Sequence, residues 1–305
     1  ESGFAYEISA DASGAPVLKP YGSGESDAPV EWTTAPPALP TGRPIEVAIS
    51  GSLHRDSLTI KELASTFIVS FDGRQGVDEL RGPEVATAWT VTGAGFDNLH
   101  GLLDSNGASA GYTEFVGVES LIGGGDDDAF SLGSTLAEAA SIAADIDGGE
   151  GTNTLRGYAA DTFWTISDKN AGTVVTDTFP IVINFKNFEN LIGADNFTDS
   201  FFFDNANQTE GKLTGRLDGG VGGLDNVVVN DPVDTEQYAM VHTTGVGQAT
   251  IEVFGKSITL GNIEPVVTTS GSDTVIAGTS FADKYTLQAI DNSNSTLRLV
   301  NEDLL

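Results

Sequence analysis

The feature that most constrains this chain is a long internal repeat whose copies begin at corners rich in glycine and aspartate. The corner Asp72–Leu80 aligns without gaps with Asp147–Leu155 and, with one extra residue, with Asp218–Val227. A fourth, less complete copy of this corner follows at Asp291–Leu297. A regular repeat of this length predicts a solenoid, a propeller or an array, because each copy must bury its apolar face against its neighbours.

A second corner recurs within each copy. The stretch Glu119–Phe130 returns as Glu189–Phe201, and a worn version runs from Ile263 to Tyr285. Each combines apolar residues, a glycine turn, acidic residues and a final aromatic residue. Trp89 and Trp164 also occupy equivalent places in the first two copies. We expect these tryptophans and the final aromatic residues to point inward and to stack as a core ladder.

The repeat zone favours strands over helices. Short runs of β-branched and aromatic residues are separated by Gly, Asn and Asp turns. These runs are Phe67–Phe71, Thr87–Val91, Thr173–Thr176, Ile181–Phe185, Val227–Val229, Thr250–Phe254 and Ser257–Leu260. Helical patterns are confined to Asp56–Leu63 and Thr135–Ala144. The prediction is an all-β fold, a right-handed parallel β-helix or β-roll solenoid; a propeller ranks second, since its blades are shorter, about 40–50 residues.

The first 64 residues have a different composition. Seven of the 11 prolines lie between Pro16 and Pro44, and proline disfavours central strands. Phe4–Ile8 and Ile45–Ile49 nevertheless alternate as strands do. We interpret residues 1–64 as a Pro-rich, non-repeat β cap or connector, with a flexible linker as the alternative. Residues 65–305 then hold the repeats, about 72–146, 147–217 and 218–290, with a partial copy at 291–305.

The amino-acid composition excludes several classes of binding partner and site. The formal net charge of −30 opposes binding to nucleic acid and to anionic membranes, and favours cations. The chain has 0 cysteines, so disulfides and thiolate metal sites are excluded. No apolar run approaches the ~18 residues of a membrane helix. Since the chain begins at Glu1 and its only methionine is Met240, we expect a processed or excised chain.

Some corners approach the nonapeptide Gly-Gly-x-Gly-x-Asp-x-U-x, which binds calcium in parallel β-rolls through turn carbonyls and aspartates. The stretch Gly123–Phe130 fits this register with aspartate in place of the third glycine, and two later segments keep the aspartate and the apolar position. The candidate ligands for Ca²⁺ are Asp126, Asp127, Asp128, Asp273 and Asp283. The alternative is that these are solvated acidic corners without a metal.

In the order of these motifs the chain resembles the repeat region of very large bacterial surface and secreted proteins of the RTX-like adhesin type. The resemblance is carried by Asp147–Leu155, Trp164 and Phe185–Gly193, and it extends over about residues 67–300. It implies an extracellular or cell-surface β-solenoid used for adhesion, stalk-building or matrix formation. It implies calcium only where nonapeptides are intact and in tandem, and the chain departs from that pattern.

These observations predict a structural or adhesive protein rather than an enzyme. The three histidines, His54, His100 and His242, are scattered. Arg81 and Arg156 recur at equivalent repeat positions, whereas an active site is normally unique along a solenoid. The alternative function is a carbohydrate-binding or polysaccharide-degrading β-helix protein.

Two kinds of partner follow from this reading. The partial fourth repeat leaves an open edge that invites pairing with another copy, head to tail, unless the chain is a piece of a longer one. A cell-surface or matrix polysaccharide is the second expected partner. The irregular segment Gly107–Thr113 is the candidate place for such a ligand, with a plain surface excursion as the alternative.

Overall fold

The computed structural model confirms that the protein is all-β. Among the residues that it describes, every regular element is a strand and no helix occurs. The chain divides into two compact units, Glu1–Asn153 (unit 1) and Thr154–Leu305 (unit 2). The described residues are 3–12, 14–20, 44–65, 67–95, 98–105, 111–133, 142–176, 181–204, 212–230, 239–245, 248–253, 256–263, 267–270, 274–277, 285–289 and 297–301.

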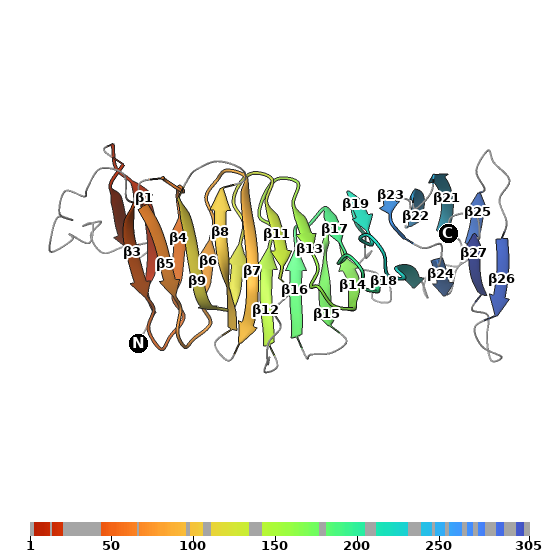
Figure 1. Cartoon of the computed structure of the whole chain (residues 1–305), viewed down its shortest axis with the longest axis horizontal. Helices are drawn as coiled ribbons and strands as arrows, with labels where there is room; N and C mark the ends of the chain where they lie inside the picture. The colour runs from red at the N-terminus through yellow and green to blue at the C-terminus, as the bar shows by residue number, and fades with distance from the viewer. Residues whose placement is uncertain are drawn as a thin grey trace. The chain divides into compact units, whose positions relative to one another are not determined.

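Unit 1 contains strands of two mixed sheets, A and B (Figure 1). Its part of sheet A has the order β2 (Pro16–Pro20), β1 (Ala5–Ala10), β4 (Ser57–Ile60), β6 (Glu79–Arg81), β10 (Ser120–Ile122) and β12 (Ile142–Asp147). Its part of sheet B has the order β11 (Ala129–Leu132), β7 (Thr87–Gly95), β8 (Asn98–Ser105), β9 (Tyr112–Val118), β5 (Phe67–Asp72) and β3 (Ile45–Ser50).

Unit 2 is likewise built from two mixed sheets. In sheet A the order is β16 (Ile181–Lys186), β15 (Ala171–Thr176), β14 (Thr162–Asp168), β18 (Asp199–Asp204), β20 (Asn226–Asn230), β24 (Val267–Ser270), β27 (Leu297–Asn301) and β26 (Tyr285–Ala289). In sheet B it is β25 (Thr274–Ala277), β21 (Ala239–Gly245), β22 (Gln248–Val253), β23 (Lys256–Gly261), β19 (Arg216–Asp218), β17 (Asn190–Ile192) and β13 (Thr154–Arg156).

In both units, neighbouring parallel strands pair in register, so that their leucines lie side by side. In unit 1, Leu80 is the register partner of Leu58 on one side and of Leu121 on the other. In unit 2, Leu191 pairs in the same way with Leu155 and Leu217. All six side chains are fully buried. Burial of a leucine contributes about 1.5–3 kcal/mol, so this ladder is a large part of the core.

The strictly parallel arrangement expected from the sequence is interrupted by three-stranded antiparallel meanders. Unit 1 has one in sheet B, formed by β7, β8 and β9. Unit 2 has one in sheet A, formed by β14, β15 and β16, and one in sheet B, formed by β21, β22 and β23. In each meander the outer strands run in the same direction, and parallel pairing resumes beyond them, as at β11–β7 and β5–β9 in unit 1 and at β14–β18 and β19–β23 in unit 2.

Trp89 and Trp164 and the corner residues Phe130 and Phe201 point inward, as the sequence predicted, and they stack in pairs. The Trp89 and Phe130 rings are 4.9 Å apart and nearly parallel, and those of Trp164 and Phe201 are 5.5 Å apart. A Leu-Arg-Gly motif precedes each of these tryptophans, at Leu80–Gly82 and Leu155–Gly157, and its glycine has a steric reason. A Cβ on Gly82 would lie 2.9 Å from the Trp89 ring, so only glycine fits beneath the indole.

The short helix predicted at Asp56–Leu63 is wrong. Its first half is β4, which pairs in parallel with β1 and β6. Leu58 and Ile60 alternate along this strand and are fully buried, so packing overrides the helical signal. The helical pattern at Thr135–Ala144 falls mostly on 134–141, outside the described residues, and β12 begins at Ile142.

The Pro-rich N-terminal zone takes part in the same sheets as the first repeat. Its strand β1 pairs with β4, and β3 pairs with β5, so the predicted boundary near residue 64 lies inside unit 1. Across the described ranges there is no helix with the length and apolar character needed to cross a membrane.

Candidate functional site

Each corner places an aspartate or asparagine immediately before or at the start of a strand, with its side chain turned inward. All are at most 2% exposed. In unit 1 these residues are Asp56, Asp78, Asp128 and Asn153, and in unit 2 they are Asp199 and Asp225. A buried carboxylate is costly unless it is hydrogen-bonded, so its partners determine its role.

Asp128 accepts hydrogen bonds with both carboxylate oxygens. Its Oδ2 accepts from the Gly124 N–H of its own turn (2.6 Å). Its Oδ1 accepts from the Thr87 N–H (2.8 Å) and from the Thr87 hydroxyl (2.5 Å). Asp128 therefore closes its own corner and ties it to the start of the neighbouring strand β7.

The tryptophan extends this arrangement into a buried chain of donors. Trp89 Nε1–H donates to Thr87 Oγ1 (2.9 Å), and the Thr87 hydroxyl donates to Asp128. In unit 2 the same chain runs from Trp164 to Thr162 and from Thr162 to Asp199. The recurring tryptophan thus has its polar atom satisfied inside the core, which supports a structural role rather than ligand stacking.

Asp78 occupies the same place in its corner but is satisfied on one side only. Its Oδ1 accepts from the Asp56 N–H (2.7 Å). Its Oδ2 is buried and has no hydrogen-bond partner. The amide that would correspond to Gly124 N–H belongs to Arg74, and it donates to Asp72 Oδ1 instead (3.0 Å).

Asn153 shows how the same corner type is satisfied in the next copy. The Gly149 N–H donates to Asp147 Oδ1 (3.0 Å), just as Arg74 does to Asp72. The Asn153 side chain then donates through Nδ2 to the Glu150 carbonyl (3.1 Å), while Oδ1 accepts from the Asp128 N–H (2.8 Å). An amide therefore suits this corner, because the second side-chain atom must be a donor.

Burial raises the pKa of several of these carboxyls. For Asp78 it raises the pKa from 3.8 to about 6; the Asp56 N–H opposes this rise, and the charges of Asp56 and Asp72 add to it. For Asp199 burial also raises the pKa to about 6, and the hydrogen bond from Thr162 acts in the opposite direction. Burial raises the pKa of Asp128 and of Glu119 as well.

The structure separates the predicted calcium ligands Asp126, Asp127 and Asp128. The first two are exposed at the tip of the corner, whereas Asp128 is buried. Asp126 Oδ1 accepts from the adjacent Asp127 N–H, and Asp127 Oδ1 accepts from the Thr152 N–H (2.7 Å). Within the described ranges no group of three or more acidic, histidine or cysteine side chains gathers as a metal site.

The remaining predicted ligands lie in segments that the structure does not describe. Asp273 and Asp283 lie outside the described residues, and so does the side chain of Tyr285. The candidate ligand loop Gly107–Thr113 is described only from Gly111 onward. The calcium assignment therefore stays a prediction from the sequence.

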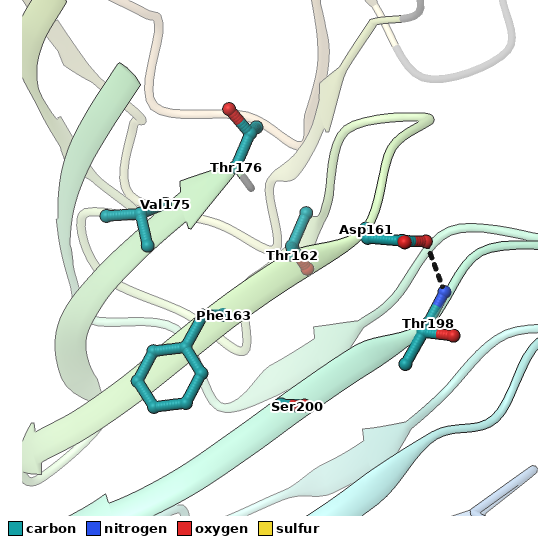
Figure 2. Close-up of a pocket in the computed structure, with 7 residues that line it drawn as sticks. All are labelled: Asp161, Thr162, Phe163, Val175, Thr176, Thr198 and Ser200. Atoms are coloured by element: carbon teal, nitrogen blue, oxygen red, sulfur yellow. Dashed lines mark hydrogen bonds between the residues drawn. The ribbon is translucent and has the colours of Figure 1, made fainter. Parts of the chain in front are cut away.

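A different site appears on the outer face of sheet A in unit 2. An open pocket of about 350 Å³ lies over β14, β15 and the start of β18. Figure 2 shows Phe163 at one end and the hydrogen-bonded pair Asp161–Thr198 at the other, with Val175 and Thr176 from the neighbouring strand along one side. Thr162 and Ser200 complete the lining.

Sequence reasoning missed both the buried Asp and Asn side chains of the corners and this pocket. A signal for the buried corner residues was present, because in every described corner an Asp or Asn stands two residues before the first buried apolar residue of the strand. The pocket had only one sequence signal. In Thr162–Ile166 the buried positions alternate, so Phe163 must face outward on an otherwise regular strand.

Comparison with known proteins adds no family: the sequence matches no protein-family model and no curated protein.

Proposed function

We propose that the chain is a structural or adhesive repeat protein in which successive coils of a right-handed parallel β-solenoid each contribute strands to the two sheets. The observation that carries the proposal is the in-register parallel pairing of equivalent leucines, Leu58 with Leu80 and Leu80 with Leu121. In a solenoid each coil stacks on the previous one, so equivalent side chains form such ladders.

The buried corner aspartates support the same proposal. In unit 1, Asp78 Oδ1 accepts from Asp56 N–H and Asn153 Oδ1 accepts from Asp128 N–H, so stacked corners are hydrogen-bonded in pairs. These carboxylates serve the backbone, and catalysis is not part of the proposed role. A protein whose buried polar groups are used for stacking is suited to bearing load in a stalk, fibre or matrix.

The proposed setting is extracellular or on a bacterial cell surface, and the proposed partners are further copies of the chain, joined head to tail. The high negative charge and the resemblance in motif order support this setting. Calcium remains the proposed stabilising ion, with Asp126 and Asp127 as the exposed carboxylates at the described corner.

Scattering and sedimentation test the solenoid and its assembly. Small-angle X-ray scattering of the purified chain is expected to give a rod-like cross-section, and a globular profile would contradict the solenoid. Sedimentation and electron microscopy over a concentration series are then expected to show end-to-end assemblies. A chain that stays monomeric at millimolar concentration with calcium present would contradict the assembly role.

Calcium has a separate test. Added Ca²⁺ is expected to raise the melting temperature of the chain, and a chelator is expected to reverse the change. The double variant D126N/D127N should lose most of this response if the described corner contributes. An identical melting curve with Ca²⁺ and with chelator would rule out the calcium proposal.

A further inference from the structure

We propose that the pocket on sheet A of unit 2 binds one unit of a neutral saccharide. The inference rests on the proposed adhesive function and deepens it by naming a ligand class. The pocket volume of about 350 Å³ lies at the lower end of the ~300–1,000 Å³ range of small-molecule sites. It opens on the outer face of a sheet, so a unit within a longer glycan chain has access to it.

The aromatic end of the pocket is exposed and held in place. Phe163 is 45% exposed, so part of its ring is open to a ligand on the outer face of the sheet. Its ring stacks on Phe202 of the neighbouring strand β18, with centroids 6.2 Å apart and planes at 29°. The stacking restrains the ring, so a ligand that packs on its other face meets a prearranged surface.

The polar groups around the pocket can form further hydrogen bonds. Ser200 Oγ accepts from Asn226 Nδ2 (2.8 Å), and a hydroxyl that accepts still has its own proton to donate. Asp161 Oδ1 accepts from the Thr198 N–H (2.8 Å), and an ionised carboxylate has further lone pairs for ligand hydroxyls. The site thus offers an acceptor and a donor beside an aromatic face.

This combination matches the chemistry of a sugar ring. The C–H groups on one face of a pyranose are slightly positive and pack on the negative face of an aromatic ring, while its hydroxyls both donate and accept. Among the described residues that line the pocket, Asp161 alone is charged, and the whole chain carries −30. Both charges disfavour acidic saccharides, so the proposed ligand is neutral.

An organic amine is a poorer fit to the same pocket. An ammonium group gains from an aromatic ring only within about 6 Å of its centre, and it gains most when a carboxylate is close to the same point. Figure 2 shows Phe163 and the Asp161–Thr198 pair at opposite ends of the pocket. One small cation cannot use both ends, whereas a ring with hydroxyls around its edge can.

Glycan binding to the full chain tests the proposal. An array of neutral and acidic oligosaccharides identifies a probe, and isothermal titration calorimetry then measures its affinity. We expect neutral oligosaccharides to bind and F163A to weaken binding by about tenfold or more, because it removes the stacking face. S200A is expected to weaken it less, since it removes one donor.

The matched control is F4A. Phe4 is also a half-exposed phenylalanine with an aromatic neighbour, Tyr6, at a ring distance of 5.9 Å, but it belongs to unit 1, whereas the pocket belongs to unit 2. F4A is expected to bind the probe as the parent chain does. Circular dichroism of F163A shows whether the variant folds, and S200A, which removes a single surface hydroxyl, provides a second test if it does not.

Several results would overturn the proposal. These are no neutral oligosaccharide bound at millimolar concentration, equal affinity in F163A and F4A, or preference for acidic oligosaccharides or alkyl amines. The sedimentation assay on the same variants keeps the two proposals apart. Loss of sugar binding with normal assembly leaves the structural role intact, and sugar binding without assembly leaves the pocket intact.

Discussion

Two corners of unit 1 place an aspartate at the same point and satisfy it differently. At Asp128 both oxygens accept hydrogen bonds, one of them from the turn amide of Gly124. At Asp78 the equivalent amide belongs to Arg74 and donates to Asp72, which leaves Oδ2 buried without a partner. The residue that precedes the first turn glycine makes the difference: it is Ile122 in the first corner and Asp72 in the second.

The comparison shows that a buried corner aspartate can be fully hydrogen-bonded at one corner and only partly hydrogen-bonded at another. A carboxylate suits a corner whose turn amide points inward. An amide suits a corner whose turn amide is taken by a preceding aspartate, as Asn153 shows. The substitution of Asp by Asn is therefore expected to have opposite effects at the two corners.

The largest effect is expected for D128N. Whichever way the new amide is oriented, its NH₂ group faces a backbone N–H, of either Gly124 or Thr87, so a charged acceptor is replaced by a repelling donor. We expect a loss of about 2–4 kcal/mol of unfolding free energy at pH 7, measured by urea denaturation. D126N, at the exposed tip of the same corner, is the control and should change stability by less than ~0.5 kcal/mol. Equal effects of the two substitutions would contradict the comparison.

The next largest effect is an increase in the free energy of unfolding, expected for D78N. The new Nδ2 can donate to a turn carbonyl as Asn153 does, and it removes a buried charge that faces Asp56, Asp72 and Glu119. We expect D78N to be about 1–3 kcal/mol more stable than the parent chain at pH 7. It should also lower the pKa of Glu119, because the charge of Asp78 raises it.

The gain should depend on pH in a defined direction. The pKa of Asp78 is raised from 3.8 to about 6, so the folded state holds the proton more tightly than the unfolded state does. The stability from this proton is complete below pH 3.8 and is lost as the pH rises to about 6. The advantage of D78N should therefore be absent near pH 4, grow up to pH 6 and then level off. A constant difference from pH 4 to 8 would contradict it.

N153D is the reverse experiment at the corresponding corner. An aspartate there can keep the bond from Asp128 N–H but cannot donate to the Glu150 carbonyl while ionised. We expect a loss of about 1–2 kcal/mol at pH 7 that is regained as the pH falls, measured by urea denaturation at several pH values. If N153D matches the parent chain at every pH, the amide is not required.

Most strands were predictable because their cause is local. Alternation in Phe67–Phe71 and Ile181–Phe185 correctly predicts β5 and β16, and the repeat places Trp89 and Trp164 in the core. The antiparallel meanders were not predictable, because whether β8 pairs with β7 or continues a parallel coil depends on contacts distant in sequence. The helix prediction at Asp56–Leu63 is wrong for the same reason, because burial of this segment between β1 and β6 stabilises a strand there.

The site was harder to predict because an aspartate serves two kinds of chemistry. The pattern around Asp128 fits a calcium nonapeptide and a backbone-binding corner equally well, and only the inward turn of its side chain separates them. The asparagine at position 153 was the available clue, because an amide keeps the hydrogen bonds of a corner but is a weaker calcium ligand. The pocket depends on side chains from β14, β15 and β18 meeting on one face, which no single stretch encodes.

The smallest effect is expected for R74G, and it tests the backbone strain in the turn of the Asp78 corner. Arg74 has φ 68°, whereas the equivalent residues are glycines, Gly149 with φ 84° and Gly220 with φ 99°. A positive φ strains an arginine, while glycine adopts it readily but loses more backbone entropy on folding. We expect R74G to gain about 0.5–1 kcal/mol in urea denaturation. R74A removes the same side chain but keeps the strain, so it should match the parent chain. If R74A gains as much as R74G, the side chain rather than the backbone conformation of residue 74 is responsible for the change in stability.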